Sequence, residues 1–259
     1  VNSFSIYIKE NKYDESIYIK EVVKKYNLEH KSTTVSTDIS IDEINQALNS
    51  LDEPYSDPSI VPTYILSKEI SQYYKVAISG DGGDELLGGY ERTMRSIQKT
   101  GFFRNLISKA YNLYPAILGT GNKLLSNSSN LEIKYRSFLE DKKLIKLLNV
   151  SSESNTFAEG LDYKNTNFYK NLLIADYKLF LPEMMMFKID RASMANSLEV
   201  RSPFVDHKLI EFIMSKNTTY LNPRNSKEIL KDYLTSDFSE EFIFRKKQGF
   251  IFDVEGWVF

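Results

Sequence analysis

Short apolar segments alternate with helical patterns along the first part of the chain. Residues 2–8 (NSFSIYI) are rich in aromatic and β-branched side chains, which predicts a buried strand. Hydrophobic spacing and turn residues predict six elements in the order strand, helix, strand, helix, helix, strand, at residues 2–8, 14–25, 33–36, 42–51, 62–74 and 76–79. Such an order is typical of a parallel sheet with helices on its faces.

The pattern changes after about Tyr90. Strand-like runs become scarce and helical periodicity dominates, with loops at 118–130 and 150–167. No internal repeat of 20–50 residues is found. The sequence therefore predicts an α/β fold in which a partial parallel sheet with flanking helices (1–95) precedes a mostly helical region (96–259).

Composition excludes several classes of protein. The 259 residues carry 33 basic and 35 acidic side chains, so no net field favours nucleic acid or a membrane surface. No segment approaches the ~20 apolar residues of a membrane helix. Cysteine is absent, which rules out disulfides and thiolate metal sites and is compatible with a reducing compartment, so a cytoplasmic location is expected. The two histidines are too few for a histidine-rich metal centre.

The segment most suggestive of chemistry is SGDGGDELLGGY, which runs from Ser79 to Tyr90 directly after a predicted strand. Ligands bind at the carboxyl ends of parallel strands, and glycines let backbone amides approach phosphate oxygens. The acids Asp81, Asp84 and Glu85 would repel a bare phosphate but suit Mg²⁺ that bridges carboxylate and phosphate. A plain acidic turn that caps a helix is the alternative, whereas the spacing does not fit an EF-hand.

This segment resembles the S-G-E/D-G-x-D-E-x-x-G-G-Y motif of the asparagine synthetase family. The synthetase domain of that family belongs to the ATP-pyrophosphatase group, with an adenine-nucleotide α-hydrolase-like fold. The resemblance implies ATP and Mg²⁺ as cofactors. It places Ser79, Gly80 and Gly82 at the nucleotide, Asp84 at the metal and Asp81 near the reacting amine.

Three further segments resemble the same family. The stretch KIDRASMANSLEVRSPFVD, which ends at Asp206, matches a K-x-D-R-x-S-M-x-x-S-x-E-x-R-x-P-F-x-D block. Its charges could form a network that only locks the helical region onto the sheet. Lys227 begins a K-x-x-L-K segment that approaches the active site in the family, although a solvated helix face is the alternative. The motif R-x-K-x-G-F recurs at 245–250.

The opening strand is also similar to a family strand whose backbone lines the adenine pocket, which makes Ile6 a candidate nucleotide contact. An ordinary core isoleucine is the alternative. The family's S-G-G-x-D-S pyrophosphate loop and its cysteine-dependent glutaminase domain are both missing. We therefore expect the chain to be part of a longer protein and to be inactive alone, with a degenerate paralogue as the alternative.

The resemblance implies that the intact enzyme activates a substrate carboxylate as an acyl-adenylate and amidates it with ammonia from a glutaminase domain. A homodimer is a candidate assembly. Asp81 replaces a common Glu, and the loop 53–59 lacks the expected Thr/Arg pattern, which points to a sugar carboxylate as an alternative acceptor. Two other hypotheses remain open: a non-catalytic nucleotide-binding domain, and an enzyme that uses an internal amine as nucleophile.

Overall fold

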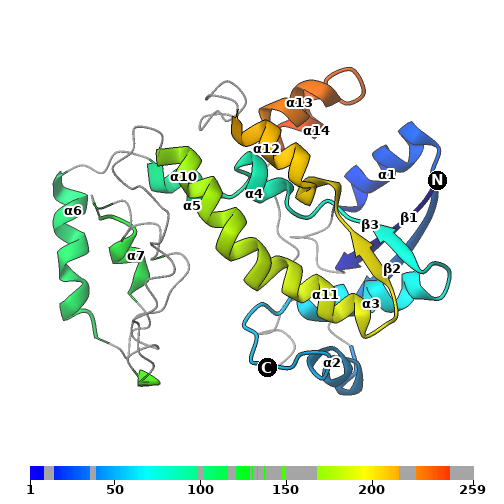
Figure 1. Ribbon diagram of the computed structural model, residues 1–259, viewed down its shortest axis with the longest axis horizontal. Helices are drawn as coiled ribbons and strands as arrows, with labels where there is room; N and C mark the ends of the chain where they lie inside the picture. Colours follow the sequence, from blue (N-terminus) through cyan, green and yellow to red (C-terminus); the bar gives the residue numbers. More distant parts are fainter. Residues whose placement is uncertain are drawn as a thin grey trace. The chain divides into compact units, whose positions relative to one another are not determined.

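The computed structural model (Figure 1) describes a large part of the chain in several stretches: residues 1–8, 15–35, 39–97, 102–115, 121–128, 130, 133, 137, 147–149, 168–215 and 226–245. The predicted cap Asp14, the loop at 150–167 and the match at 246–250 lie outside these residues.

The chain divides into two compact units, each built from separated stretches of sequence. The first contains Val1–Gly82, Leu181–Asp206 and Ile229–Phe259, and the second contains Gly83–Phe180 and His207–Glu228. Each unit therefore includes residues from both the predicted α/β part (1–95) and the predicted helical part (96–259).

The first unit contains the β-structure. Strand β1 (Asn2–Ile8) pairs in parallel with β2 (Glu29–Val35), and β3 (Val76–Ile78) pairs in parallel with β4 (Glu199–Arg201). The α/β class with parallel strands is confirmed. The described strands nevertheless form two separate two-stranded sheets, where the sequence predicted a single sheet.

The helices of the first unit lie between and after these strands: α1 (Ser16–Tyr26), α2 (Ile41–Leu48), α3 (Ile60–Ser71), α11 (Phe187–Met194), a short 3₁₀ turn (Pro203–Val205), α13 (Glu228–Leu234, whose first residue falls in the second unit) and α14 (Glu240–Ile243). Ser40 caps α2, because its Oγ accepts a hydrogen bond from the backbone N–H of Glu43 at 3.2 Å. Helix α3 begins two residues earlier than predicted, since Pro62 is tolerated within a first turn.

The second unit is helical in its described residues. It contains α4 (Gly83–Leu87), α5 (Glu91–Ile97), α6 (Phe102–Lys109), a 3₁₀ turn (Ala110–Leu113), α7 (Asn122–Leu125), α10 (Phe168–Ala175) and α12 (His207–Ser215). A π-helical segment (Asp176–Met186) follows α10. It begins in the second unit, and its part from Leu181 onward belongs to the first unit and includes Pro182, which has no N–H to donate.

The core of the first unit surrounds α3. Side chains of β1, α2, α3 and α11 form one buried apolar cluster: Ile6, Ile44, Ala47, Ile60, Val61 and Ala192. A second cluster joins Phe238, Phe242 and Ile243 to α1 through Tyr18 and Val22. Helix α3 thus packs on both α11 and β1 and connects the two parts of this unit that are far apart in the sequence.

Candidate functional site

The loop that follows β3 is held by the segment that follows β4. The backbone N–H of Ser79 donates to the carbonyl oxygen of Arg201 at 2.9 Å, and the Ser202 hydroxyl donates to the carbonyl oxygen of Asp81. Gly82 has φ +85°, and an added Cβ would lie 2.9 Å from Cγ1 of Val205, so glycine is required there. An added Cβ at Gly80 would meet nothing within 4 Å, which leaves its backbone open to a ligand.

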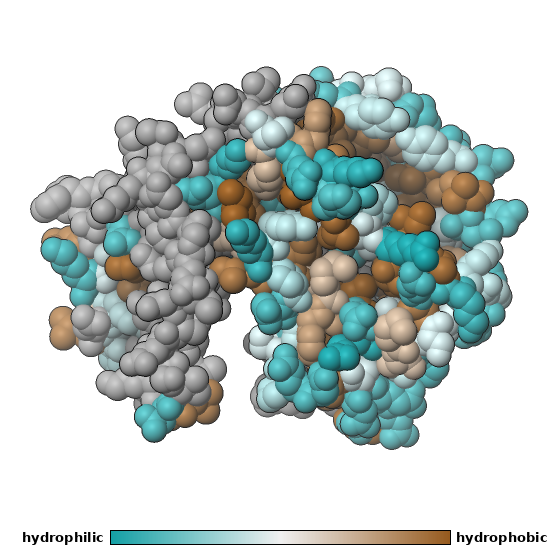
Figure 2. Space-filling view, viewed as in Figure 1, coloured by the Kyte–Doolittle hydropathy of each residue, from teal (hydrophilic) through white to brown (hydrophobic). Residues whose placement is uncertain are grey.

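A cavity of about 850 Å³ lies in the first unit beside this loop. Its polar lining includes Ser79, Asp81 and Lys188. The rest comes largely from apolar side chains of α3, β3, α11, β4 and the residue before β4: Leu66, Ile70, Val76, Ile189, Leu198 and Val200. Figure 2 shows apolar residues open to solvent among polar ones over this unit, and the exposed ones include Val76 and Ile78. The cavity therefore combines a polar end with an apolar body.

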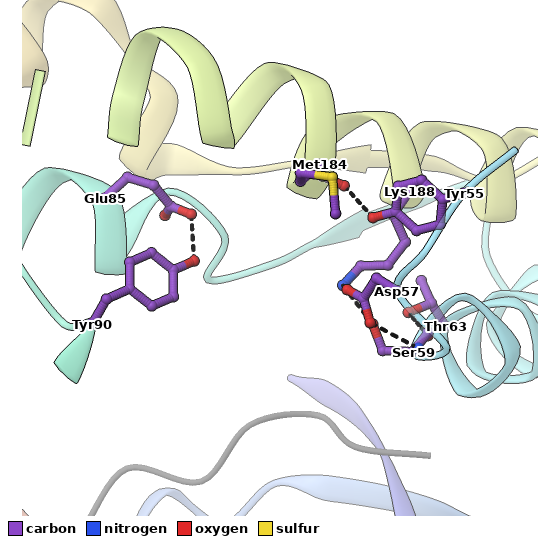
Figure 3. Close-up of polar contacts among 8 residues, drawn as sticks. All are labelled: Tyr55, Asp57, Ser59, Thr63, Glu85, Tyr90, Met184 and Lys188. Atoms are coloured by element: carbon purple, nitrogen blue, oxygen red, sulfur yellow. Dashed lines mark hydrogen bonds and ion pairs between the residues drawn. The ribbon is translucent and has the colours of Figure 1, made fainter. Parts of the chain in front are cut away.

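Lys188 brings a positive charge to the cavity. Its side chain is 6% exposed, and its Nζ lies 3.1 Å from Oδ2 of Asp57 and donates to Oγ of Ser59 at 2.7 Å (Figure 3). Burial alone would raise the pKa of Asp57, but the Lys188 ammonium and hydrogen bonds from Ser59 lower it below its ordinary value. A buried ammonium with a carboxylate and a hydroxyl as partners is electrostatically compensated.

The loop that carries Asp57 is fixed at further points, as Figure 3 shows. The Ser59 backbone N–H donates to Oδ1 of Asp57 at 2.9 Å, and the Thr63 hydroxyl donates to the carbonyl oxygen of Ser59 at 2.7 Å. The Tyr55 hydroxyl donates to the carbonyl oxygen of Met184 at 2.5 Å, and burial raises the pKa of that phenol. These contacts hold the loop from Tyr55 to Ser59 against the start of α11.

Asp84 and Lys227 form an ion pair in the second unit. Lys227 Nζ lies 2.6 Å from Oδ1 of Asp84, and the two side chains are 33% and 21% exposed, respectively. An added Cβ at Gly89 would collide with the Asp84 carboxylate and lie 2.6 Å from Cε of Lys227. Gly89 is therefore the residue that leaves room for this pair.

The backbone of Lys227 is also specialised. It has φ +57°, a left-handed conformation that is uncommon for a residue with a side chain, and it directly precedes α13. Its N–H donates to the carbonyl oxygen of Leu87 at the end of α4 at 3.0 Å. The backbone and the side chain of Lys227 therefore both contact residues of α4.

Glu85 is the buried acid of the segment. Its Oε1 accepts a hydrogen bond of 2.6 Å from the Tyr90 hydroxyl (Figure 3). Burial raises the pKa of Glu85, although the bond from Tyr90 opposes that shift, and burial followed by the Glu85 charge raises the pKa of Tyr90. Glu85 is thus packed inside the protein, unlike the partly exposed Asp84.

A second buried carboxylate lies close in the same unit. Asp176 is fully buried and accepts from Nη2 of Arg92 and from the Thr93 hydroxyl, both at 2.8 Å. The Arg92 guanidinium also stacks on the rings of Tyr90 and Phe180, at 3.8 and 4.0 Å from their centroids. These contacts connect α5 to the start of the π-helical segment and support the position of Tyr90.

The predicted site residues lie in three different environments. Ser79 and Asp81 line the cavity, and Asp84 and Lys227 lie side by side. The side chain of Ile6 lies in the apolar core and does not line the cavity, so any nucleotide contact would involve its backbone. The roles assigned to these residues stay predictions.

The charged block around α11 forms local pairs. Nη2 of Arg191 lies 2.7 Å from Oδ2 of Asp52, while Nε of Arg201 lies 2.8 Å from Oε1 of Glu199. Nη1 of Arg191 also lies 4.0 Å from Oδ2 of Asp190, so two charge pairs of the predicted network occur in the described residues, as separate local pairs. Sequence analysis missed the ion pair of Lys188 with Asp57. Lys188 lies in a segment that resembles the family and Asp57 lies in the loop 53–59, but no sequence pattern relates the two residues.

The described residues contain no cluster of three or more His, Cys, Asp or Glu side chains that could hold a metal ion by themselves. Within the same part of the chain, no helix is long and apolar enough to cross a membrane.

Comparison with known proteins defines the class. The family model for asparagine synthase matches residues 1–259, so the chain belongs to the asparagine synthase family. It is 26% identical over 277 residues to asparagine synthetase [glutamine-hydrolyzing] 1 of Bacillus subtilis, which covers 100% of this chain and 43% of that protein. It is 39% identical over 90 residues to putative asparagine synthetase [glutamine-hydrolyzing] 2 of Methanocaldococcus jannaschii, which covers 35% of this chain and 17% of that protein. The chain thus spans less than half the length of these relatives.

Proposed function

We propose that the protein is an ATP-dependent ligase that converts a carboxylate into an amide. The observation that carries this proposal is the contact of Asp84 with Lys227, because it joins the acid of a glycine-rich loop to the lysine of a distant segment. Membership of the asparagine synthase family and the names of the relatives support the same reaction class.

In the proposed reaction, an oxygen of the substrate carboxylate attacks the α-phosphorus of ATP and pyrophosphate leaves. Ammonia then attacks the acyl carbon of the adenylate, and AMP leaves after loss of a proton. Backbone amides of Ser79, Gly80 and Gly82 would hold nucleotide oxygens at the carboxyl end of β3. Asp81 would accept the proton from the attacking amine.

Lys227 would stabilise the negative charge that develops on the acyl oxygen. Its Nζ is held by Asp84 and its side chain is one third exposed, so its position is largely set before the substrate binds. A fixed cation of this kind costs little reorganisation during the reaction, which is the condition for strong electrostatic catalysis.

The residues present fit Mg²⁺ as a partner of ATP. This ion needs only one or two carboxylates when phosphate oxygens and water complete its shell, so the lack of a three-residue cluster is no obstacle. Asp84 is the carboxylate we assign to it, since it already attracts a cation and is partly open to solvent. When bound, Mg²⁺ would neutralise phosphate charge.

The test is Lys227→Ala in the full-length protein. Removal of one electrostatic stabiliser is expected to lower the rate of amide formation by a factor of about 10²–10³. Lys231→Ala is the matched control, because Lys231 lies one helical turn further on, with its Nζ 5.3 Å from the ring centre of Phe244. An unchanged synthetase rate for Lys227→Ala would remove this lysine from the mechanism.

Full-length protein should also use glutamine as the ammonia source, as the names of the relatives suggest. Hydrolysis of glutamine should survive Lys227→Ala, since that step would belong to a separate domain. Binding of ATP with no release of pyrophosphate on any carboxylate would instead favour a non-catalytic nucleotide-binding protein.

The acceptor is a second question. The relatives are named as asparagine synthetases, which favours aspartate. Asp81, whose carboxylate is one methylene shorter than that of Glu, and the loop 53–59, which lacks the Thr/Arg pattern expected for aspartate, favour a different carboxylate such as that of a sugar. Parallel assays with aspartate and with a uronic acid derivative would separate these acceptors through amide formation.

A further inference from the structure

The hydrogen-bonded ladder between β3 and β4 ends where the glycine-acid segment begins. The N–H of Glu199 donates to the carbonyl oxygen of Lys75 at 2.9 Å. Further along, the N–H of Ser79 donates to the carbonyl oxygen of Arg201 at 2.9 Å. The next bond of a parallel ladder would run from the N–H of residue 203 to the carbonyl oxygen of Ser79. That residue is Pro203, which has no N–H, so the ladder cannot continue past Ser79.

Pro203 also restricts the residue that precedes it. Steric contact with the proline ring limits such a residue to extended conformations. Ser202 has φ −115° and ψ 119°, which is an extended conformation. The 3₁₀ turn that follows is closed by the N–H of Val205, which donates to the carbonyl oxygen of Ser202 at 3.3 Å. The backbone of Ser202 is therefore held between the end of a strand and a turn.

The side chain of Ser202 supplies the contact that the ladder cannot make. Its hydroxyl donates to the carbonyl oxygen of Asp81, two residues beyond the last ladder bond. Val205 packs at the same place, since its Cγ1 would lie 2.9 Å from a Cβ added to Gly82. The segment after β4 thus contacts the peptide between Asp81 and Gly82 through a hydrogen bond and an apolar group.

The hydrogen bond to Asp81 determines where the N–H of Gly82 points. The Asp81 carbonyl and the Gly82 N–H belong to one peptide unit, and the described residues contain no cis peptide bond. In a trans peptide these two groups point in opposite directions. Because Ser202 holds the carbonyl oxygen, the N–H of Gly82 is directed away from Ser202.

The loop after β3 offers two donors to a ligand. Gly82 is buried, and its N–H makes no backbone hydrogen bond within the described part of the chain. The hydroxyl of Ser79 is also buried and has no hydrogen-bond partner among the described residues. Buried donors of this kind are costly unless a ligand or water accepts from them. Two of them on one short loop suit an anion with several oxygens, such as a phosphate.

We propose that Ser202 is a positioning residue for the nucleotide. Its hydroxyl fixes the peptide between Asp81 and Gly82, so that the Gly82 N–H is oriented towards a phosphate oxygen of ATP before ATP binds. This inference rests on the proposed function, which assigns Gly82 to the nucleotide, and adds the residue that orients it. Without the Ser202 hydroxyl the loop would adopt several conformations, and ATP would bind well only to the fraction in which the N–H is oriented.

Ser202→Ala in the full-length protein is the first test. Loss of the hydrogen bond should raise the KM for ATP about 3–10-fold. The kcat at saturating ATP should stay within about twofold, because bound nucleotide orders the loop again, whereas loss of a catalytic residue would lower kcat. Ser202→Thr keeps the hydroxyl and should restore the KM to within about twofold of the unmodified protein. A KM for ATP that is unchanged in Ser202→Ala would overturn the proposal.

Ser50→Ala is the matched control for this experiment. The Ser50 hydroxyl donates to the carbonyl oxygen of Ala47 at 2.6 Å, in the same unit but beside α2. This variant also loses a hydrogen bond from a serine to a carbonyl, so its melting temperature should fall about as much as that of Ser202→Ala. Its KM for ATP should not change. An equal rise of the KM in both alanine variants would assign the effect to general destabilisation and contradict a specific role of Ser202.

Hydrogen exchange of the Gly82 amide gives a readout that does not depend on activity. In a titration with ATP and no carboxylate acceptor, ATP should slow this exchange in the unmodified protein. The midpoint should move to about 3–10-fold higher ATP in Ser202→Ala. The Ala77 amide is the internal control, because it faces β4 in the ladder and should be protected at every ATP concentration. Exchange at Gly82 that saturating ATP does not slow would overturn the proposed orientation.

The proposed function and the role of Ser202 fail in different ways. If the unmodified full-length protein binds no ATP, both are wrong. If that protein binds ATP and forms amide, but Ser202→Ala has the same KM for ATP and the same midpoint at Gly82, only the role of Ser202 is wrong.

Discussion

At the scale of single residues, two carboxylates show how environment separates similar groups. Lys188 and Ser59 lower the pKa of Asp57 despite its burial, whereas burial raises the pKa of Glu85. Asp57 therefore contributes stability above its unfolded pKa, and this contribution is lost as the pH falls through its lowered folded pKa. Glu85 acts in the opposite direction, because its folded state favours the protonated form.

The raised pKa of Glu85 predicts that Glu85→Gln becomes more stable relative to the unmodified protein as the pH rises. The native protein binds more protons at Glu85 than the unfolded chain does, so its free energy of unfolding falls between the unfolded and the raised folded pKa. An amide has no proton to lose, and its oxygen can still accept from the Tyr90 hydroxyl. Denaturant unfolding at pH 4 and pH 7 should show the variant improving relative to the unmodified protein at the higher pH.

The neighbouring Glu91 supplies the control for this experiment. Its carboxylate is exposed and pairs with Arg95 at 2.7 Å on the helix surface, so Glu91→Gln should change stability little at either pH. A Glu85→Gln variant that becomes relatively less stable from pH 4 to pH 7 would show that the ionised carboxylate stabilises the fold.

At the scale of elements, the turn after α4 depends on glycine for space. Gly89→Ala should lower the free energy of unfolding by about 1–3 kcal/mol, because the new methyl group collides with the Asp84–Lys227 pair. Gly80→Ala is the matched control, since its methyl group meets no atom within 4 Å and should change stability by less than about 1 kcal/mol. Denaturant unfolding of both variants measures the difference.

Equal stability of these two alanine variants would mean that the Asp84–Lys227 pair can move aside without cost. In that case the amide-forming rate of Gly89→Ala would report whether the displaced pair still functions.

Sequence patterns predicted the elements that carry their own signal. Strands β1 and β3 were found because apolar, aromatic and β-branched residues dominate them, and helix α2 because its sequence from residue 42 has a helical pattern. Strand β2 was predicted only from residue 33, since its first half, Glu29–Ser32, is polar and is a strand because it pairs with β1. Strand β4 was missed because its charged residues surround a single Val200, and its structure comes from β3.

The candidate site could also be predicted only in part from the sequence. A local motif identified Asp84, and a distant resemblance identified Lys227, but only the folded chain shows them at 2.6 Å. The ion pair of Lys188 with Asp57 joins two segments that no periodicity relates. Long-range contacts of this kind depend on how α3 packs on α11, which local patterns do not specify.

At the scale of the whole molecule, each unit combines segments that are far apart along the chain. The first unit needs β3 and β4 from different halves of the sequence, and the second needs Lys227 to reach α4. Contacts between distant segments must form before the functional residues of either unit come together. Each unit therefore has to fold before its functional residues are in place.

A last prediction concerns the 259-residue chain on its own. It should bind ATP weakly and release no pyrophosphate when aspartate or another carboxylate is present, because its sequence contains no S-G-G-x-D-S stretch that would hold the pyrophosphate. The full-length protein should release pyrophosphate under the same conditions. An enzyme-coupled pyrophosphate assay on both proteins, with Lys227→Ala of the full-length form as background, measures the difference. Pyrophosphate release by the shorter chain above that background would show that residues 1–259 already hold every group required for adenylation.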